Sequence, residues 1–386
     1  MDTDKRGTRI AMKVLITGGA GFIGTHLARR LLDEGREVTI MDNFSPQIHG
    51  GIQTLSSDLA DHVRLVTGDV RDVKTFHSAL DGQEVVVHLA AETGTGQSMY
   101  EVERYTSVNL TGTAVLMDYL VNHTGSRVEK IITASSRAIY GEGKYQCATH
   151  GIVFPEARLE AAMKVGQFEP VCPRCAAPCE ALPTDEDSRL LPTSYYGLTK
   201  QVQEQMTLLF GRTRNLSAFA LRYQNVYGPG QSLKNPYTGI LAIFSNQARV
   251  GKPIYIFEDG EESRDFVYIA DVVEATCRCL RLEVAGVESV NVGSGVRTTV
   301  REVVEEITRF FGSSSPITVT GGFRLGDIRH NVADLTRARR QLGFEPRWSF
   351  TDGIREFLSW ALSQEVQAGL YEQSLAELSA KGLMRT

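Results

Sequence analysis

Lys13-Val-Leu-Ile-Thr-Gly-Gly-Ala-Gly-Phe-Ile-Gly24 is an apolar run that breaks into glycines and then resumes at helical spacing. Residues 14–16 are typical of a buried strand, and Phe22 to Glu34 carries the apolar period of a helix that ends at Gly35. The turn between them, Gly19-x-Gly21-x-x-Gly24, fits a dinucleotide-binding fingerprint. Glycine lets backbone amides approach a pyrophosphate, and the helix start adds free N–H groups and the positive end of its dipole. The stretch predicts a Rossmann-type α/β fold.

The residue after the next predicted strand distinguishes between the two nicotinamide dinucleotides. That strand, Glu37 to Met41, is followed by Asp42, eighteen residues after Gly24. A carboxylate at this point can hydrogen-bond the adenine ribose, and it repels a 2′-phosphate. We therefore expect NAD as the cofactor in preference to NADP.

Composition argues against several classes of protein. The 386 residues carry a formal net charge of −5 with no basic block, which argues against nucleic acid as a partner. No apolar run approaches the roughly eighteen residues of a membrane span, and Met1 to Arg6 lacks the apolar core of a signal peptide. A cytoplasmic protein with no membrane partner is expected. Six cysteines in so long a chain do not make a disulfide scaffold, so clustered ones are better candidates for metal ligands.

Strand-like and helical segments alternate through the first part of the chain. This alternation predicts a doubly wound parallel sheet with helices on both faces, whose ligands bind at the carboxyl ends of the strands. The expected later strands are 63–68, 85–90, 130–135 and 217–222, and the expected helices are 104–121 and 196–210. Beyond Tyr223 we expect a hairpin at 258–261 and helices after Asp271 and Thr299. The predicted domains are a NAD-binding Rossmann domain at 12–223 with a cysteine-rich insert at 142–187, a mainly substrate-binding, mixed α/β lobe at 224–364, and a C-terminal tail at 365–386.

Tyr196-Gly-Leu-Thr-Lys200 begins a predicted helix, so its tyrosine and lysine lie on one face. A free phenol has a pKa of about 10, and a nearby ammonium stabilises the phenolate as a general base. Such a pair is often only a surface contact. Here Ser136 ends a strand downstream of the nucleotide turn and offers a second hydroxyl, which favours a catalytic site.

These motifs together resemble the extended short-chain dehydrogenase/reductases, specifically the NAD-dependent epimerases and dehydratases of nucleotide sugars. The resemblance extends from Val14 to about Trp360. Its motifs occur in order at Thr17–Gly24, Asp42-Asn43, Gly68-Asp-Val70, His88-Leu-Ala-Ala91, Asn109, Ser135-Ser136, Tyr140-Gly141, Tyr196-x-x-x-Lys200, Arg222–Pro229, Arg264–Asp271 and Arg324-x-Gly-Asp327.

The resemblance implies roles for the matching positions. Tyr196 would be the base, Lys200 its activator and a ligand of the nicotinamide ribose, and Ser136 the second hydroxyl. Cofactor contacts are implied for Gly18, Gly21, Phe22, Ile23, Gly24, Asp42, Asn43, Asp69, Val70, Leu89, Ala90, Ala91, Tyr196, Lys200 and Tyr223. Substrate contacts are implied for Thr95, Ser136, Arg137, Asn225, Arg264, Arg324 and Asp327, with Asn225, Arg264 and Arg324 holding a diphosphate. The family also implies a homodimer formed through helices that include the Tyr196 helix.

Departures from the family pattern narrow the reaction. Sugar 4,6-dehydratases carry Asp-Glu after the active-site hydroxyl, whereas this chain has Arg137-Ala138, which favours epimerisation at C4. Glucose/galactose-type 4-epimerases usually carry a lysine where Thr93 stands. The run Glu92–Gln97 and the cysteine-rich insert look most like those of the family's dTDP-L-rhamnose 4-epimerases, so a dTDP-6-deoxyhexose is the expected substrate. The alternatives are another epimerase of UDP-hexose, UDP-uronate or NDP-heptose, a 4,6-dehydratase, a 4-oxidoreductase and a non-catalytic NAD-binding regulator.

The insert contains two metal-knuckle patterns. Cys147-x-x-His150 and Cys172-x-x-Cys175 have the spacing of four tetrahedral zinc ligands, with Cys179 to spare. A structural zinc is the first interpretation, and a reduced, metal-free loop is the alternative. Because the insert lies between the two catalytic segments in sequence, we expect it to form a wall or lid of the sugar pocket.

Several other residues have simpler interpretations. His88 is expected to be a core histidine, and Cys277 and Cys279 core residues of a helix. Asn109 is either structural or a ligand contact, and Arg264 could instead pair with Asp271 on the surface.

Overall fold

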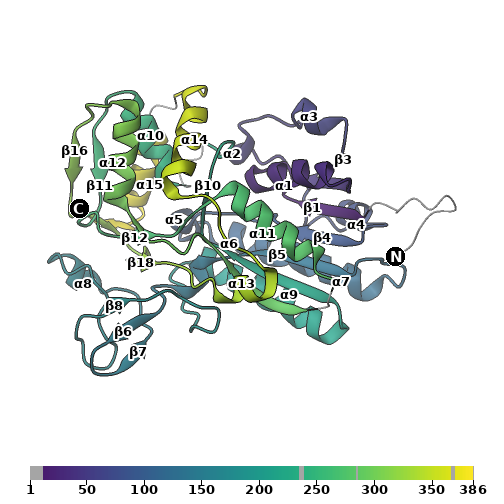
Figure 1. Ribbon diagram of the computed structural model, residues 1–386, viewed down its shortest axis with the longest axis horizontal. Coiled ribbons are helices and arrows are strands. Elements are labelled where there is room, and N and C mark those ends of the chain that lie inside the picture. Colours follow the sequence, from purple (N-terminus) through teal and green to yellow (C-terminus); the bar gives the residue numbers. More distant parts are fainter. Residues whose placement is uncertain (1–11, 234–238, 284–285, 367–369, 386) are drawn as a thin grey trace.

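The computed structural model describes residues 12–233, 239–283, 286–366 and 370–385. Its centre is a seven-stranded parallel sheet in the order β14-β9-β5-β4-β1-β2-β3 (Figure 1). The strands are β1 Lys13–Thr17, β2 Glu37–Asp42, β3 Arg64–Thr67, β4 Val85–His88, β5 Lys130–Ser136, β9 Ser217–Tyr223 and β14 Val287–Val292. The predicted Rossmann-type sheet is confirmed, with one strand more than the sequence indicated.

Apolar side chains on the two faces of this sheet pack against two layers of helices and form two cores. Val14 and Ile16 of β1 pack into one core, whereas Leu15 between them packs into the other. The first core takes in α1 (Phe22–Asp33) and α11 (Ile269–Arg281), and the second takes in α4 (Val73–Leu80), α7 (Gly112–Asn122) and α9 (Tyr195–Arg214). Cys277 and Cys279 are buried in the first core, as predicted.

The expected helix 104–121 is interrupted. It consists of α6 (Val102–Thr106), one π-helical turn (Ser107–Thr111) and α7. Asn109 lies in that turn, where its Oδ1 accepts a hydrogen bond from the Glu92 amide at 2.8 Å and its Nδ2 donates to Thr199 Oγ1 at 3.0 Å. The π turn therefore aims a fully buried amide at α9, which favours the structural interpretation of Asn109.

The second lobe groups three helices over several short sheets. Its helices are α10 (Ile240–Arg249), α12 (Val300–Phe311) and α14 (Phe350–Leu362), and its strands are β10 Asn225–Tyr227, β11 Ile254–Ile256, β12 Ser263–Arg264, β13 Phe266–Tyr268, β15 Thr298–Thr299, β16 Ile317–Val319, β17 Phe323–Arg324 and β18 His330–Asn331. The predicted hairpin at 258–261 is wrong, because β11 pairs with β16 whereas β12 pairs with β15 and β18. The chain also returns from this lobe to the main sheet as β14, with α11 packed against α1.

The insert forms a small subdomain of its own, at the lower left of Figure 1 beneath β12 and β18. It contains β6 (Tyr145–Cys147), β7 (Gly151–Val153), α8 (Glu160–Met163) and β8 (Glu180–Ala181). The segment predicted as a tail contains α15 (Leu370–Ala380) and β19 (Met384–Arg385), and β19 pairs with β17. The remaining short elements are α2 Pro46–His49, α3 Ser57–Ala60, α5 Thr95–Ser98, a 3₁₀ turn Arg137–Tyr140 and α13 Thr336–Leu342.

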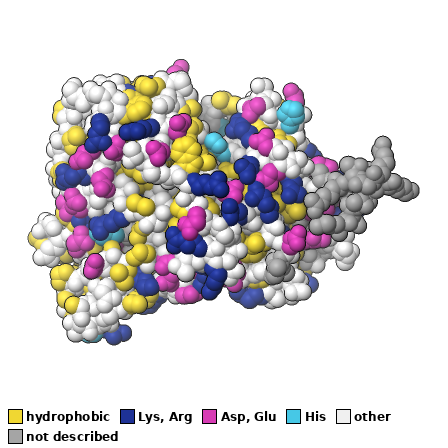
Figure 2. All heavy atoms as spheres, in the orientation of Figure 1, with side chains coloured by type: hydrophobic (Ala, Val, Ile, Leu, Met, Phe, Trp, Pro, Cys, Tyr) yellow, Lys and Arg dark blue, Asp and Glu magenta, His cyan; other side chains and the backbone are white. Residues whose placement is uncertain are grey.

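The sequence predicted that neither a membrane nor a nucleic acid is a partner of this protein. In the part of the chain that the structure describes, no helix is long and apolar enough to cross a membrane. Acidic and basic side chains are mixed over the face drawn in Figure 2. The stretch Met1–Arg6, on which the absence of a signal peptide was predicted, lies outside the described residues.

Candidate active site

One cavity of about 540 Å³ lies at the carboxyl ends of the central strands, between the two lobes. Every residue predicted to contact cofactor or substrate lines it, from Gly18 at the first turn to Asp327 in the second lobe. The structure therefore brings together positions that are up to about three hundred residues apart in sequence. The metal candidates of the insert lie elsewhere.

The glycine turn after β1 has the shape that a dinucleotide requires. A Cβ on Gly18, whose φ is +66°, would lie 2.9 Å from the Ala90 amide nitrogen, and one on Gly24 would lie 2.5 Å from Gly19 Cα. The helix α1 begins after Gly21, which has no side chain to cap its first amides. Free N–H groups and the helix dipole therefore face a cradle that only glycine leaves open, and this fits a pyrophosphate.

Carboxylates stand at the two strand ends beyond the turn. Asp42 Oδ2 accepts from the Ala20 amide at 3.0 Å, and His49 Nε2 lies 3.4 Å from Asp42 Oδ1. Asp69 accepts from Arg71 and from Asn43 Nδ2, and these bonds, Arg71 first, keep the pKa of the Asp69 carboxyl below its usual range. Two acidic side chains at this end suit the ribose and adenine of NAD rather than the 2′-phosphate of NADP. His49 was missed by the sequence analysis, since it follows no motif.

The catalytic candidates converge where β5 meets α9. Ser136 ends β5 beside Tyr223 of β9, and Ser194 caps α9 by accepting a hydrogen bond from the Gly197 amide at 3.1 Å. The cap fixes the helix start, one turn before Lys200. Lys200 Nζ donates to Ala134 O and to Gln203 Oε1, each at 2.9 Å. Burial lowers the pKa of this ammonium to about 7.

Tyr196 lines the cavity with its ring held at right angles to that of Tyr105, the centroids 6.4 Å apart. Burial raises the pKa of the Tyr196 phenol, while a hydrogen bond with Ser136 and the charge on Arg137 act in the opposite direction. The sequence predicted that Lys200 would bring this pKa down. In the protein alone burial outweighs the Ser136 hydrogen bond and the Arg137 charge, so the phenol keeps its proton more strongly than a free tyrosine.

Three arginines face the opposite half of the cavity. Arg264 is held by the carbonyls of Ser263, Ile328 and Arg329 at 2.8–3.0 Å. Arg324 donates to Asp327 Oδ2 at 2.8 Å and lies 5.6 Å from the centre of the Phe257 ring, a contact that the sequence analysis missed. The alternative pairing of Arg264 with Asp271 is wrong, because the Asp271 carboxylate accepts from the Arg347 and Trp348 amides.

Arg137 differs from the other two arginines. Among the described residues no hydrogen bond or ion pair engages its guanidinium, which lines the cavity. Burial and the neighbouring charge on Arg264 lower the pKa of Arg137 to about 9. An unpaired cation in a partly buried site calls for a polar or anionic ligand.

Several residues that line the cavity also carry a buried oxygen without a partner among the described residues. Asn225 Oδ1 and Glu262 Oε2 have no hydrogen-bond partner within the described chain, although Arg329 Nη1 lies 3.9 Å from the Glu262 oxygen. Burial, reinforced by Glu258, raises the pKa of Glu262 to about 7. Unpartnered buried oxygens on a cavity wall are suited to accept hydrogen bonds from ligand hydroxyl or N–H groups. Glu262 stands two residues before Arg264, and this proximity in sequence could have drawn attention to it.

His88 behaves as predicted. It is fully buried, its Nδ1 lies 2.8 Å from Thr17 Oγ1, and its Nε2 lies 3.2 Å from Thr113 Oγ1. Burial lowers the pKa of His88 to about 3, so the ring is neutral. It is a core residue that ties β4 to β1 and α7.

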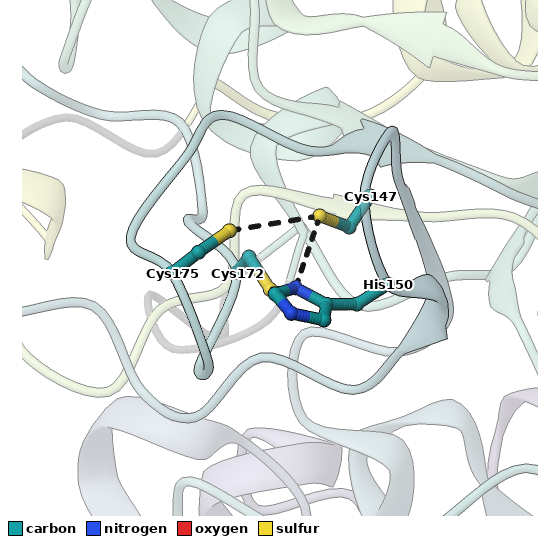
Figure 3. Close-up of side chains that lie close together, drawn as sticks. All are labelled: Cys147, His150, Cys172 and Cys175. Atoms are coloured by element: carbon teal, nitrogen blue, oxygen red, sulfur yellow. Dashed lines mark hydrogen bonds between the residues drawn. The ribbon is translucent and has the colours of Figure 1, made fainter.

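The insert gathers its four predicted ligands into one cluster (Figure 3). The ligand atoms of Cys147, His150, Cys172 and Cys175 all lie within 4.8 Å of one another. Cys147 Sγ is 3.8 Å from Cys175 Sγ and 3.7 Å from His150 Nδ1, and Cys172 Sγ is 3.4 Å from the same nitrogen. The structure thus assembles a Cys₃His set from two separate loops.

The predicted position of the insert is wrong. Of the described residues that line the cavity, none lies between Arg137 and Tyr196, so the insert is not a wall of the pocket. Its own core of Tyr145, Cys147, Val153 and Cys172 holds it as a separate unit. Its Arg158 nevertheless bonds to two residues that line the pocket, Glu258 and Asp327.

Comparisons with known proteins agree with this site. Residues 15–151 match the model of the GDP-mannose 4,6 dehydratase family, and residues 171–293 match that of the NAD dependent epimerase/dehydratase family. A dTDP-L-rhamnose 4-epimerase of Burkholderia thailandensis is 41% identical over 357 residues, covering 92% of this chain and 96% of that protein. UDP-glucose 4-epimerase of Thermotoga maritima, solved with UDP-glucose, superposes with a TM-score of 0.74 at 29% identity, covering 91% of this chain and 99% of the other. The Thermus thermophilus UDP-glucose 4-epimerase complex with NAD gives 0.69 at 26% identity, covering 92% and 100%.

Proposed function

This chain belongs to the NAD-dependent epimerase/dehydratase family of nucleotide-sugar enzymes, and on that premise we propose that it is a 4-epimerase of a dTDP-activated 6-deoxyhexose such as dTDP-L-rhamnose. The observation that carries the proposal is 41% identity to a dTDP-L-rhamnose 4-epimerase over nearly the whole chain, together with Ser136, Tyr196 and Lys200 at one cavity. The Glu92–Gln97 loop, which contributes Thr95 to the wall, adds support.

The glycine turn and the carboxylates at the strand ends would hold NAD, which when bound would supply the acceptor and then the donor of the hydride at C4. The positive charge of oxidised NAD would also oppose the burial that raises the pKa of the Tyr196 phenol. Tyr196 takes the proton from the C4 hydroxyl, and Ser136 bridges the same oxygen. Lys200, which lines the same cavity, would contact the nicotinamide ribose. After the 4-keto sugar presents its other face, Tyr196 returns the proton to O4, so the protein ends each turnover in the protonation state in which it began.

The second lobe has a separate task in this proposal. Arg264 and Arg324 hold the diphosphate, whose oxygens match the fork of a guanidinium. Asn225 joins them on the diphosphate, and Arg137, whose charge acts on Tyr196, contacts the part of the ligand nearer to that side chain. Anchoring the diphosphate keeps the substrate bound while the hexose ring rotates to present its other face.

The alternatives are weaker for chemical reasons. A 4,6-dehydratase needs an acid beside the active-site hydroxyl, and Arg137-Ala138 stands there. A 4-oxidoreductase would use the same Tyr196 and Lys200 but would release NADH in each turnover. A regulator without activity has no use for three intact catalytic side chains. Epimerases of UDP-hexoses, UDP-uronates or NDP-heptoses use the same chemistry, and only the substrate separates them.

Proton NMR of dTDP-L-rhamnose incubated with the purified protein, without added cofactor, tests the proposal. We expect new anomeric signals that approach a fixed ratio, with no growth of absorbance near 340 nm. Tyr196→Phe is the matched control and should leave the spectrum unchanged. Growth at 340 nm that becomes continuous once free NAD is supplied would identify an oxidoreductase, and an unchanged wild-type spectrum would remove this substrate.

We also propose that the insert binds one Zn²⁺ through Cys147, His150, Cys172 and Cys175. Zinc–sulfur bonds of about 2.3 Å and zinc–nitrogen bonds of about 2.0 Å set tetrahedral edges of roughly 3.8 Å between sulfurs and 3.6 Å between sulfur and nitrogen. The observed 3.8, 3.7 and 3.4 Å separations lie close to these values. Four protein ligands fill a tetrahedron, so the metal would be structural rather than catalytic.

Elemental analysis of the purified protein tests the zinc site. We expect one zinc per chain in the wild type, much less in Cys172→Ser, and an unchanged content in Cys179→Ser, which removes the insert's remaining thiol. Zinc contents that are equal in Cys172→Ser and the wild type would contradict the assignment.

The homodimer stays a prediction, supported by α9. Tyr195, Leu198 and Leu209 repeat along one stripe of this helix with exposed fractions of 41, 45 and 58%. Light scattering on the wild type and on Leu198→Glu tests it: a dimer mass that falls to a monomer supports the prediction, and a monomeric wild type contradicts it. The cytoplasmic location is likewise still a prediction.

A further inference from the structure

The insert is joined to the substrate side of the cavity by a buried arginine. Arg158, whose side chain is 4% exposed, donates to Glu142 Oε1 at 3.1 Å, Glu258 Oε2 at 2.8 Å, Phe168 O at 3.2 Å and Asp327 O at 2.9 Å. Burial opposes the charge on Arg158, but the bond to Glu258 and the charge on Glu142 raise its pKa overall. One guanidinium therefore links the insert, through Glu142 and Phe168, to the second lobe, through Glu258 and Asp327.

Two further contacts bind the same loop. Met163 and Phe168 of the insert form a small apolar cluster with Phe323, the neighbour of Arg324. Glu169 accepts from Arg329 Nε at 2.7 Å and lies 3.2 Å from His330 Nε2. The segment from Phe323 to His330 is thus held by the insert at both ends and, through Arg158, in the middle.

That segment carries the groups proposed to hold the diphosphate. Arg324 and Asp327 lie on it, and Arg264 is oriented by its carbonyls at Ile328 and Arg329. The Arg329 amide in turn donates to Glu142 Oε2 at 2.7 Å. The insert therefore contacts this segment on the side that faces away from the cavity, and no described residue of the insert lines the cavity.

The four candidate metal ligands include residues next to the segment of the insert that makes these contacts. Cys172 follows Glu169 by three residues, and the bridge between Val171 and Pro178 closes the loop that contains Cys172 and Cys175. The other two ligands come from the β6–β7 turn. A metal that joins the two loops would fix the 168–172 segment relative to β6, whereas four free side chains in the same place would not.

We propose that the metal-held insert positions the diphosphate-binding side of the active site, with Arg158 as the positioning residue that transmits its order. The inference rests on the proposed function, because it assumes that Arg264 and Arg324 hold a nucleotide diphosphate. Loss of the metal or of the Arg158 fork then weakens nucleotide binding. It leaves the NAD side of the cavity and the Tyr196 chemistry intact.

The test compares Arg158→Lys, Cys172→Ser and the double variant with the wild type. Arg158→Lys keeps the charge but cannot make four bonds. Lys144→Met is the matched control, since it removes an ion pair with Asp185 inside the insert that does not reach the Phe323–His330 segment. Affinities for dTDP and for UDP are measured by calorimetry, with bound NAD, KM and kcat measured on the same preparations.

We expect each single variant to weaken nucleotide binding and raise KM by about tenfold, with bound NAD and kcat near wild type. The double variant should be no weaker than the weaker single one, because both act through one path. Equal nucleotide affinity in wild type and variants would overturn this inference alone. A simultaneous loss of NAD would overturn it too, since it would mean general unfolding. Wild-type protein that binds neither nucleotide would overturn the proposed function as well.

Discussion

The two sides of the cavity are built in different ways. The NAD side consists of short loops that directly follow parallel strands, so each functional residue sits within a few positions of the strand that places it. The substrate side collects Asn225, Arg264, Arg324 and Asp327 from separate parts of the second lobe. Its order comes from a buried ionic network that includes Arg158 and Arg329, two side chains that do not line the cavity.

This difference indicates which changes each side tolerates. On the NAD side the main constraint is steric, because backbone must come close to the ligand at glycines. On the substrate side it is electrostatic, since breaking one member of a buried charge network leaves the others unpaired at a cost of several kcal/mol. Variants can therefore separate cofactor binding from substrate binding.

The largest effect is expected where the two sides meet, at Tyr196. Tyr196→Phe removes the proton acceptor but keeps the ring that packs against Tyr105. We expect kcat to fall by about 10²–10⁴-fold, with NAD content and nucleotide affinity near wild type. Rates and equilibrium binding on the same preparation check this. A variant that keeps more than a tenth of the wild-type rate would exclude Tyr196 as the base.

The next largest effect is expected on NAD binding alone, without a change in nucleotide binding on the substrate side. Gly24→Ala places a Cβ 2.5 Å from Gly19 Cα and 2.7 Å from Gly18 O. Because the backbone of the turn must shift, we expect loss of most co-purifying NAD with dTDP affinity retained. Chromatography of the nucleotide released by acid measures it. Gly125→Ala, where the added methyl meets open space, is the control, and equal NAD in both variants would contradict the steric account.

A smaller effect is expected on the pH dependence. Arg137→Gln removes the positive charge that lowers the pKa of the Tyr196 phenol. The phenolate is then less stable, so the acidic limb of the kcat profile should move to higher pH by roughly one unit or less. Arg137→Lys keeps the charge and should move the limb less. A limb that moves to lower pH in Arg137→Gln would contradict the inference that Arg137 lowers the pKa of Tyr196.

The smallest effect concerns stability. Glu262 has a pKa of about 7 in the folded protein, against about 4.3 for an unperturbed side chain. Between these values the unfolded chain ionises while the folded one keeps its proton, so stability is lost as pH rises through this window. Glu262→Gln cannot ionise and so does not lose this stability. The stability of Glu262→Gln relative to the wild type should therefore grow by about 3 kcal/mol from pH 4.5 to pH 8 in urea unfolding. An advantage that does not change with pH would show that Glu262 ionises normally.

The sequence predicted the NAD side better than the substrate side, because local motifs define the first and long-range contacts define the second. The glycine turn, Asp42 and the Tyr196–Lys200 pair are local patterns whose spacing fixes their geometry, and all of them line the cavity. The Cys₃His cluster was also predicted, because each of its two motifs is local in sequence and already has the spacing of a pair of metal ligands. The hairpin at 258–261 was wrong, since the partners of β11 and β12 lie far along the chain and no local pattern marks them.

The supporting contacts could not be read from the sequence. Arg158 follows no motif, and its four partners span residues 142 to 327. The insert was expected at the pocket wall because it lies between catalytic segments in sequence, yet it packs behind the wall. The pKa of Tyr196 was expected to fall through Lys200, but burial, which depends on the whole fold, dominates it.

The central claim is that C4 of the sugar loses and regains the same hydrogen within one active site. The most direct measurement follows dTDP-L-rhamnose deuterated at C4 through the reaction in ordinary water, with the product analysed by NMR and mass spectrometry. The account predicts a product inverted at C4 that retains the deuterium, formed more slowly than from unlabelled substrate. Product in which hydrogen from water has replaced the deuterium would contradict a hydride held and returned by the enzyme.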